Sequence, residues 1–170
     1  MNGVEKVLRK MDIEAALALA GVMTMTSCAS TADKAQRAAQ NRQYVQEQLA
    51  AENFKIKVDY MYPQRYPSRP IMSDFWLEMK EGSVNSYLPY FGQVHMPSLY
   101  SIDEGLNFET PIQNYTKRRN ERKHRTEIQF NAKSRDDYYA YSIYIYDDGN
   151  ADISVHSNRR DAIRYSGELE

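Results

Sequence analysis

From residue 53 onward, apolar and polar residues alternate with a period of two, the pattern of β-strands that bury one face. Strands of this kind are predicted at residues 54–62, 74–80, 84–91, 106–119, 126–132, 138–146, 151–156 and 163–165. Most connections between them are short, and the one at 147–150 places Gly149 where a hairpin turn favours a positive φ. Because short connections leave no room for crossovers, neighbouring strands are expected to be antiparallel.

A meander of about eight strands leaves two exposed edges, and closure into a barrel removes both. The sequence therefore predicts a mainly β fold, an antiparallel up-and-down meander closed into a small lipocalin-like barrel. A two-sheet sandwich is the alternative. In the first strand, the alternation places Tyr60 and Tyr62 on the buried face with Phe54. Residues 106–119 are expected to form one broken strand or two short ones, with Pro111 at the break.

Residues 33–52 contain neither glycine nor proline and are rich in strong helix formers, so we predict an N-terminal α-helix there. Its first half offers only alanines to a core, whereas Tyr44, Val45 and Leu49 give the second half an apolar face. We expect the first half to be a solvated spacer and the second half to dock on the β domain. A surface helix packed along its whole length is the alternative.

The N-terminus has the organisation of a bacterial lipoprotein signal: basic residues, a short apolar run and then Cys28, the only cysteine of the chain. The apolar run of about 12 residues is shorter than the roughly 20 that a membrane-spanning helix needs. We therefore interpret residues 1–27 as a signal peptide, 28–52 as the lipidated N-terminus and tether helix, and 53–170 as the β domain. Acylated Cys28 would attach the protein to an envelope membrane. The alternative is a cytosolic protein with an amphipathic N-terminal helix and an idle buried thiol.

Charge and residue spacing argue against several classes of function. The net charge of −1 lacks the basic excess of a nucleic-acid-binding protein. The three histidines are far apart and never have the spacing of metal ligands, so neither a metal site nor a cofactor is expected. The sequence contains no nucleophile elbow, P-loop or dinucleotide fingerprint. The chain is therefore not expected to be an enzyme, and a hydrolase ranks last among the hypotheses.

Several short segments resemble one known family. The most specific are Tyr-Leu-Pro-Tyr-Phe-Gly at 87–92 and Ser-Asn-Arg-Arg at 157–160. They are accompanied by Met-Tyr-Pro at 61–63, Thr-Pro-Ile at 110–112 and Asp-Asp-Tyr-Tyr at 136–139. In order and spacing, over residues 33–168, they resemble the lipoproteins of gut Bacteroidetes grouped as domain-of-unknown-function family 4251.

The resemblance implies an exported, lipidated protein with a lipocalin-like barrel, and it implies no activity and no functional residue. For lipoproteins of such bacteria, an acidic run after the lipidated cysteine implies transport to the cell surface. Only Asp33 follows Cys28 in this chain. The expected location is therefore the outer membrane, with the protein facing the periplasm.

Tyrosine is concentrated in the predicted strand at 138–146. Within it, Tyr139 and Tyr141 have the parity of a buried face and are expected in the core. The other three tyrosines lie on the opposite face and are candidate ligand-binding residues, because a tyrosine ring offers a flat apolar surface and a hydroxyl. These candidates are Tyr138, Tyr144 and Tyr146. The alternative explanation is the general preference of aromatic residues for strands.

Two other stretches are candidate contact surfaces. The 62–72 loop combines aromatic and arginine side chains, as interface hot spots do, and its candidate partner-contact residues are Tyr62, Arg65, Tyr66 and Arg69. The basic run at 117–125 is a candidate for contact with anionic headgroups. Its cations are Lys117, Arg118, Arg119, Arg122, Lys123 and Arg125. The alternatives are an ordinary barrel-end loop and a solvated hairpin tip whose cations protect a strand edge.

The leading hypothesis is a non-enzymatic envelope lipoprotein that holds a small apolar or amphipathic ligand in the barrel mouth. The alternative is a structural or interaction lipoprotein that contacts another envelope protein through the 62–72 loop. Interior volume separates the two, because a barrel of about eight strands is just wide enough for side chains to fill. A cavity of roughly 300 Å³ or more would favour a ligand, and a packed interior would favour the interaction protein.

Overall fold

The computed structural model describes residues 31–95, 105–134 and 137–170. Its elements are α2 (Thr31–Ala51), β1 (Phe54–Pro63), β2 (Arg69–Lys80), β3 (Ser83–Leu88), β4 (Leu106–Asn120), the short 3₁₀ helix η1 (Glu121–Lys123), β5 (Arg125–Ser134), β6 (Asp137–Tyr146), β7 (Asn150–Ser157) and β8 (Ile163–Leu169). The predicted signal peptide and Cys28 lie outside the described residues.

The chain divides into two compact units after Arg37. Of the first unit, only the helical residues 31–37 are described. The second unit, residues 38–170, contains the rest of α2 and all the described strands.

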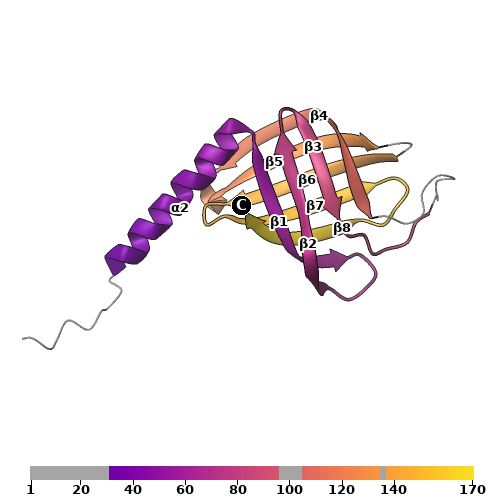
Figure 1. The fold of residues 1–170 in the computed structure, drawn as a ribbon, viewed down its shortest axis with the longest axis horizontal. Helices are drawn as coiled ribbons and strands as arrows, with labels where there is room; N and C mark the ends of the chain where they lie inside the picture. Colours follow the sequence, from indigo (N-terminus) through magenta and orange to yellow (C-terminus); the bar gives the residue numbers. More distant parts are fainter. Residues whose placement is uncertain (1–30, 96–104, 135–136) are drawn as a thin grey trace, which may run out of the picture. The chain divides into compact units, whose positions relative to one another are not determined.

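The described strands form one closed antiparallel barrel, in which each strand pairs with the next and β8 pairs with β1 (Figure 1). β5 and β6 pair along their whole length. By contrast, β2 and β3 pair only over Trp76 to Lys80 of β2, and in the first half of β2 only Arg69, Pro70 and Phe75 have a partner, which lies in β1. The predicted meander barrel is confirmed, and the alternative of a two-sheet sandwich is wrong.

Large side chains fill the interior of the barrel. The bulkiest fully buried ones are Tyr141, Tyr165, Phe130, Ile56, Leu77, Met79, Leu88, Leu106, Ile128, Ile143, Ile145 and Ile153. Phe130 and Tyr141 stack with their ring centroids 4.9 Å apart. Tyr139 is also buried, so the predicted core positions of Tyr139 and Tyr141 are confirmed. The packing agrees with the small interior that about eight strands enclose.

A β-bulge in β1 reverses the parity that the sequence predicts. Between Val58 and Tyr60 the register shifts against both β2 and β8. Beyond the bulge Met61 is 9 % exposed and belongs to the core, whereas Tyr60 and Tyr62 are half-buried on the outer face. The predicted burial of Tyr60 and Tyr62 is therefore wrong, because one extra residue moves each later side chain to the other face.

Gly167 of β8 allows β1 to approach closely at this bulge. It pairs with Val58, and a Cβ atom added to it would lie 1.9 Å from the carbonyl oxygen of Lys57. Any side chain at this position would push the two strands apart. The bulge and the glycine thus form one local arrangement.

Two prolines lie in strands rather than at breaks. β4 continues through Pro111, and its irregularity lies between Gln113 and Thr116, where Asn114 has a φ of 54°. Pro70 lies near the start of β2, in the half without a partner strand in β3, where a missing N–H costs no ladder hydrogen bond. The predicted break at Pro111 is wrong, and the predicted 62–72 loop shortens to residues 64–68.

In α2 the change from exposed to buried residues occurs at Val45. Residues 33–44 are exposed, whereas Val45 and Leu49 are buried, which confirms the predicted division of the helix into a solvated and a docked half. Tyr44 is 41 % exposed, so its predicted place on the apolar face is wrong. Val45 and Leu49 are four residues apart and share one face of the helix, and the adjacent position points away from that face.

Candidate functional site

A pair of adjoining clefts lies on the outer face of the barrel, over β6, β7, β8 and the end of β1. The first, which we name the outer cleft, has a volume of about 410 Å³, and the outward side chains that line it are Tyr62, Arg125, Tyr144, Asp152, Ser154 and Arg164. The second has a volume of about 390 Å³, and its outward side chains are those of Asp59, Tyr146, Asp148, Asn150, Asp152 and Ser166. Asp152 is shared, so the two clefts adjoin.

Strand register explains why this part of the sheet is hollowed. One row of directly paired residues runs through Tyr144, Asp152, Ser166 and Tyr60. The next row runs through Ser142, Ser154, Arg164 and Tyr62. Residues paired in this way lie on the same face of the sheet. In the first row the short side chains of Asp152 and Ser166 lie between two tyrosines, and in the second row Ser142 and Ser154 lie beside the long side chains of Arg164 and Tyr62.

One wall of the outer cleft is a stack of Arg125 on tyrosine rings. The guanidinium of Arg125 lies 3.8 Å from the ring centroid of Tyr144 and 5.9 Å from that of Tyr146. Arg125 Nη2 donates to Glu127 Oε1 at 2.8 Å, and the Tyr146 hydroxyl donates to Asp152 Oδ2 at 3.1 Å. Hydrogen bonds from Arg118, Arg125 and Asn120 lower the pKa of Glu127 to about 2. This wall is therefore held in place by its own polar contacts.

The opposite wall consists of Tyr62 and Arg164, and it depends on the bulge in β1. The guanidinium of Arg164 lies 5.4 Å from the ring centroid of Tyr62, and the ring of Tyr60 lies 5.1 Å from that of Tyr62. The Tyr62 hydroxyl also lies 3.5 Å from Ser166 Oγ. Arg164 is exposed, and within the described parts of the chain it has no carboxylate at ion-pair distance. Arg164 is therefore the cation of this wall that is available to a ligand.

The three candidate tyrosines of β6 fall into two places. Tyr144 and Tyr146 line the clefts, whereas Tyr138 is 53 % exposed and lies under Lys133, whose Nζ is 5.2 Å from its ring centroid. All three lie on the outer face, with parity opposite to that of the buried Tyr139. At one end of the barrel interior, the gap between Tyr90 and Tyr139 has no volume for a water-sized sphere.

Sequence reasoning missed three residues of the outer cleft, Asp152, Ser154 and Arg164. Arg164 has the outward parity of the last strand, next to Ile163 and Tyr165, and that alternation was the signal that could have identified it. Asp152 faces outward in β7 for the same reason. Tyr62 was selected for another role, and only the bulge, which has no plain sequence signature, places it at this cleft.

The other predicted partner-contact residues gather around Phe91. The ring of Tyr66 meets the ring of Phe91 edge-on at 4.7 Å, and the Arg69 guanidinium lies 4.0 Å from the Phe91 centroid. Arg65 Nε lies 3.2 Å from Asp161 Oδ2. Tyr66 is 39 % exposed and Phe91 37 % exposed. The structure therefore brings Arg65, Tyr66 and Arg69 to one place and puts Tyr62 at the outer cleft.

Asp161 anchors the segment after β3 to the β7–β8 connection. It is 6 % exposed, and it accepts hydrogen bonds from His95 Nε2 at 2.9 Å and from the Gln93 amide at 3.2 Å. Burial raises the pKa of Asp161, but these hydrogen bonds together with the charge of Arg65 outweigh burial and leave the pKa below its ordinary value. The Ser157 hydroxyl donates to Asp137 and is not part of the cluster of Asp161, His95 and Gln93. These hydrogen bonds hold the segment after β3 against the β7–β8 connection.

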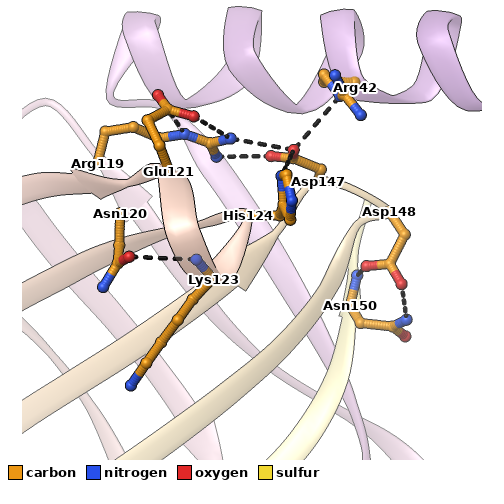
Figure 2. A network of polar contacts seen from close by, with 9 residues as sticks. All are labelled: Arg42, Arg119, Asn120, Glu121, Lys123, His124, Asp147, Asp148 and Asn150. Carbon is orange, nitrogen blue, oxygen red and sulfur yellow. Dashed lines mark hydrogen bonds and ion pairs between the residues drawn. The ribbon is translucent and has the colours of Figure 1, made fainter.

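The basic run at 117–125 is largely engaged by neighbouring carboxylates. Arg119 donates to both oxygens of Asp147, at 2.6 and 3.0 Å, and Asp147 also meets Arg42 of α2 at 3.3 Å (Figure 2). Lys117 Nζ donates to the Leu49 carbonyl at the end of α2 and to Glu52, and Arg118 and Arg125 bond Glu127. The run therefore fastens α2 to the barrel at its C-terminal end and, through Asp147, at Arg42 of the exposed half. Only Arg122 and Lys123 of the predicted cations have no ion pair among the described residues.

The described residues contain no group of histidine, cysteine and acidic side chains that could hold a metal ion. In the described part of the chain, the structure has no helix with the length and apolar character of a membrane span.

Comparison with known proteins identifies the family and the fold. The family model described as a domain of unknown function, DUF4251, matches residues 36–169. A crystal structure of a DUF4251 family protein from Bacteroides eggerthii DSM 20697 is similar to this chain, with a TM-score of 0.58 and 13 % sequence identity, and covers 77 % of this chain and 87 % of its own. No curated protein matches. With its barrel and most of its length matched, the chain belongs to the DUF4251 family.

Proposed function

We propose that this protein is a non-enzymatic binding module that holds a small amphipathic ligand in the outer cleft. The observation that carries the proposal is the bulge in β1, which turns Tyr62 outward against Arg164 and so builds the wall opposite Arg125 and Tyr144. Bulges are frequent next to functional sites because they re-aim side chains. A tyrosine pair with guanidinium groups offers both apolar faces and hydrogen-bond donors.

By the criterion of interior volume, the packed interior counts against a ligand in the barrel mouth and for the interaction protein, so the binding module rests on the outer cleft instead. Large side chains occupy the centre of the barrel, and the gap between Tyr90 and Tyr139 admits no water-sized sphere. The outer cleft, at about 410 Å³, is within the range of roughly 300–1,000 Å³ that small-molecule sites occupy. A ligand on the outer face also needs no displacement of core side chains.

A ligand screen followed by amide chemical-shift mapping tests the proposal. We expect that a set of water-soluble amphipathic compounds contains members that shift amide signals of β7 and β8 around Ser154 and Arg164. Tyr144→Ala should weaken that binding at least several-fold, because the ring is one wall of the cleft. Tyr138→Ala is the matched control, since it removes an outward tyrosine of the same strand outside the cleft. Shifts confined to other parts of the barrel would overturn the proposal.

The second candidate function is contact with another envelope protein through the shortened loop. The specific observation is the exposed cluster in which Tyr66 and Arg69 pack on Phe91. Aromatic and arginine side chains together are typical of interface hot spots. Tyr66→Ala should abolish capture of such a protein from envelope extracts while leaving ligand shifts at the outer cleft unchanged. Equal capture by the variant and the parent would exclude this surface.

We also propose that the protein is a lipoprotein of the outer membrane that faces the periplasm, attached through acylated Cys28. The support is the sequence alone: basic residues, a short apolar run and the single cysteine. Cys28→Ala should move the protein from the membrane fraction to the soluble fraction of cells. Protease added to intact cells should leave the parent protein uncut. Membrane association of the Cys28→Ala variant, or digestion of the parent, would contradict the respective part of this proposal.

A further inference from the structure

Resting on the proposed function, we infer that the ligand of the outer cleft is an acidic saccharide. Its carboxylate lies against Arg164, and its hydroxyl groups meet Asp152 and the serines of the floor. The inference names the chemistry of the ligand, which the proposed function leaves open.

The first argument is the unequal state of the two guanidinium groups in the cleft. Arg125 is engaged, because its Nε and Nη2 atoms donate to Glu127 at 3.1 and 2.8 Å. Arg164 is exposed and, among the described residues, meets only the face of the Tyr62 ring. A guanidinium is a planar fork that matches the two oxygens of a carboxylate. The cleft thus presents one available site for an anionic group.

The second argument is that a hydrogen-bond acceptor, Asp152, lies next to Arg164. Asp152 is exposed, receives the Tyr146 hydroxyl and has no ion pair within the described ranges. Its strand position is diagonal to Arg164, since Ser154 pairs with Arg164 and Ser166 with Asp152. Diagonal neighbours on one sheet face lie roughly 7–8 Å apart. A simple dianion would be repelled by Asp152, whereas a molecule with one carboxylate and several hydroxyls satisfies both groups.

The third argument is the shape and polarity of the rest of the cleft. Tyr62 and Tyr144 stand on opposite walls, each with a guanidinium over its ring, and hydroxyls of Ser154 and Ser166 lie along the floor of the two clefts. Sugar rings have weakly polar faces that pack on aromatic rings and edges that carry hydroxyls. The adjoining clefts, about 410 and 390 Å³ in volume, offer room for more than one ring.

Calorimetric titration of the full chain with two matched probes tests the inference. The probes are cellobiouronate, a disaccharide with a single carboxylate, and its methyl ester, which differ in charge and little in shape. We expect the acid to bind, and to bind roughly tenfold or more tightly than the ester, because a charge-assisted pair is lost in the ester. Raising the salt concentration should weaken binding of the acid and leave binding of the ester nearly unchanged.

Variants assign the effect to the residues named. Arg164→Gln should reduce the affinity for the acid to that of the ester, whereas Arg122→Gln, which neutralises an exposed arginine of η1, should change neither. Asp152→Asn keeps the hydrogen-bonding shape and removes the charge. It should leave the affinity for the acid the same or lower. Tighter binding of the acid by Asp152→Asn would mean that Asp152 repels the ligand, and it would overturn the inference.

Other outcomes separate the inference from the proposed function. Equal binding of acid and ester, or equal effects of Arg164→Gln and Arg122→Gln, would overturn the acidic saccharide and leave the binding module intact. The same holds if neither saccharide binds while amphipathic compounds still shift amides around Ser154 and Arg164. If no compound of either set shifts those amides, the inference and the proposed function fail together.

Discussion

At the residue scale, one buried hydroxyl pair shows how an apolar barrel accommodates polar atoms. Tyr141 donates to Ser86 Oγ at 3.2 Å, and Ser86 donates to the Leu106 carbonyl at 2.7 Å. Burial raises the pKa of Tyr141 far above its ordinary value, so this hydroxyl is protonated and acts as a donor near neutral pH. The hydroxyls of Tyr141 and Ser86 therefore each have a hydrogen-bond partner.

The two ends of this chain should respond unequally to substitution. Ser86→Ala strands the Tyr141 hydroxyl and the Leu106 carbonyl, so we expect a loss of about 1–3 kcal/mol in the free energy of unfolding. Tyr141→Phe strands nothing, because Ser86 keeps its acceptor, and it should cost about 1 kcal/mol or less. Urea denaturation followed by circular dichroism measures both. A larger loss for Tyr141→Phe would contradict the assigned direction of the donors.

Gly167 is the residue for which substitution should be most severe. Its missing Cβ leaves room for the Lys57 carbonyl, so Gly167→Ala should cost about 2–4 kcal/mol through displacement of β1. Gly82→Ala is the control, since no atom lies within 4 Å of the added Cβ and only its φ of +73° is unfavourable. The control should cost about 1 kcal/mol. Similar unfolding midpoints for the two variants would show that β1 yields easily at the bulge.

At the scale of the element, β1 is a strand whose two halves obey opposite parities. The first half buries Phe54, Ile56 and Val58, and the half after the bulge buries Met61. The change of parity occurs where β1 lies against Gly167 of β8. The missing Cβ of Gly167 lets the backbone of β1 approach closely there. The outward tyrosines of the outer cleft are a direct consequence.

This parity gives a prediction about side-chain truncation in β1. Met61→Ala should lower the free energy of unfolding by about 2 kcal/mol, since it empties a core position. Tyr60→Ala should cost about 1 kcal/mol or less, although the removed side chain is larger, because it faces outward. Equilibrium urea unfolding of the two variants decides the matter. The reverse order of destabilisation would mean that the alternation continues unbroken through the strand.

At the scale of the whole molecule, three carboxyl groups couple the stability of the barrel to pH. In the folded chain the pKa of Glu127 is about 2, and the pKa values of Asp147 and Asp161 also lie below their ordinary values. Hydrogen bonds from arginines are the main cause for Glu127 and Asp147. The unfolded chain therefore binds protons at a higher pH than the folded chain does.

The sign of the pH dependence follows from these lowered pKa values. The stability that these groups contribute should be complete above about pH 5 and should be lost progressively as the pH falls toward 2. Urea midpoints measured between these limits should fall with pH in the parent chain. A variant with Glu127→Gln, Asp147→Asn and Asp161→Asn should be less stable near neutrality and show a shallower fall. Parallel curves would place the acid sensitivity elsewhere.

How much of this architecture the sequence predicts depends on how local its causes are. Strand parity and short turns are local, so the closed meander, the buried Tyr139 and Tyr141 and the docked half of α2 all follow from residue patterns. The bulge depends on Gly167, about a hundred residues away in sequence, and it moved Tyr62 from the predicted core to the cleft. Arg164 lies beside Tyr62 because of the register between β1 and β8, which a residue pattern within one strand does not give.

The incomplete pairing of β2 has a consequence for how the ring opens. Because β3 pairs with β2 only over Trp76 to Lys80, the first half of β2 is held on one side alone. In heavy water, amide protons there should be replaced by deuterium well before those shared by β5 and β6. Native-state exchange read by mass spectrometry would therefore find the earliest uptake among these strands between Arg69 and Phe75. We therefore expect the barrel to open first at the N-terminal half of β2.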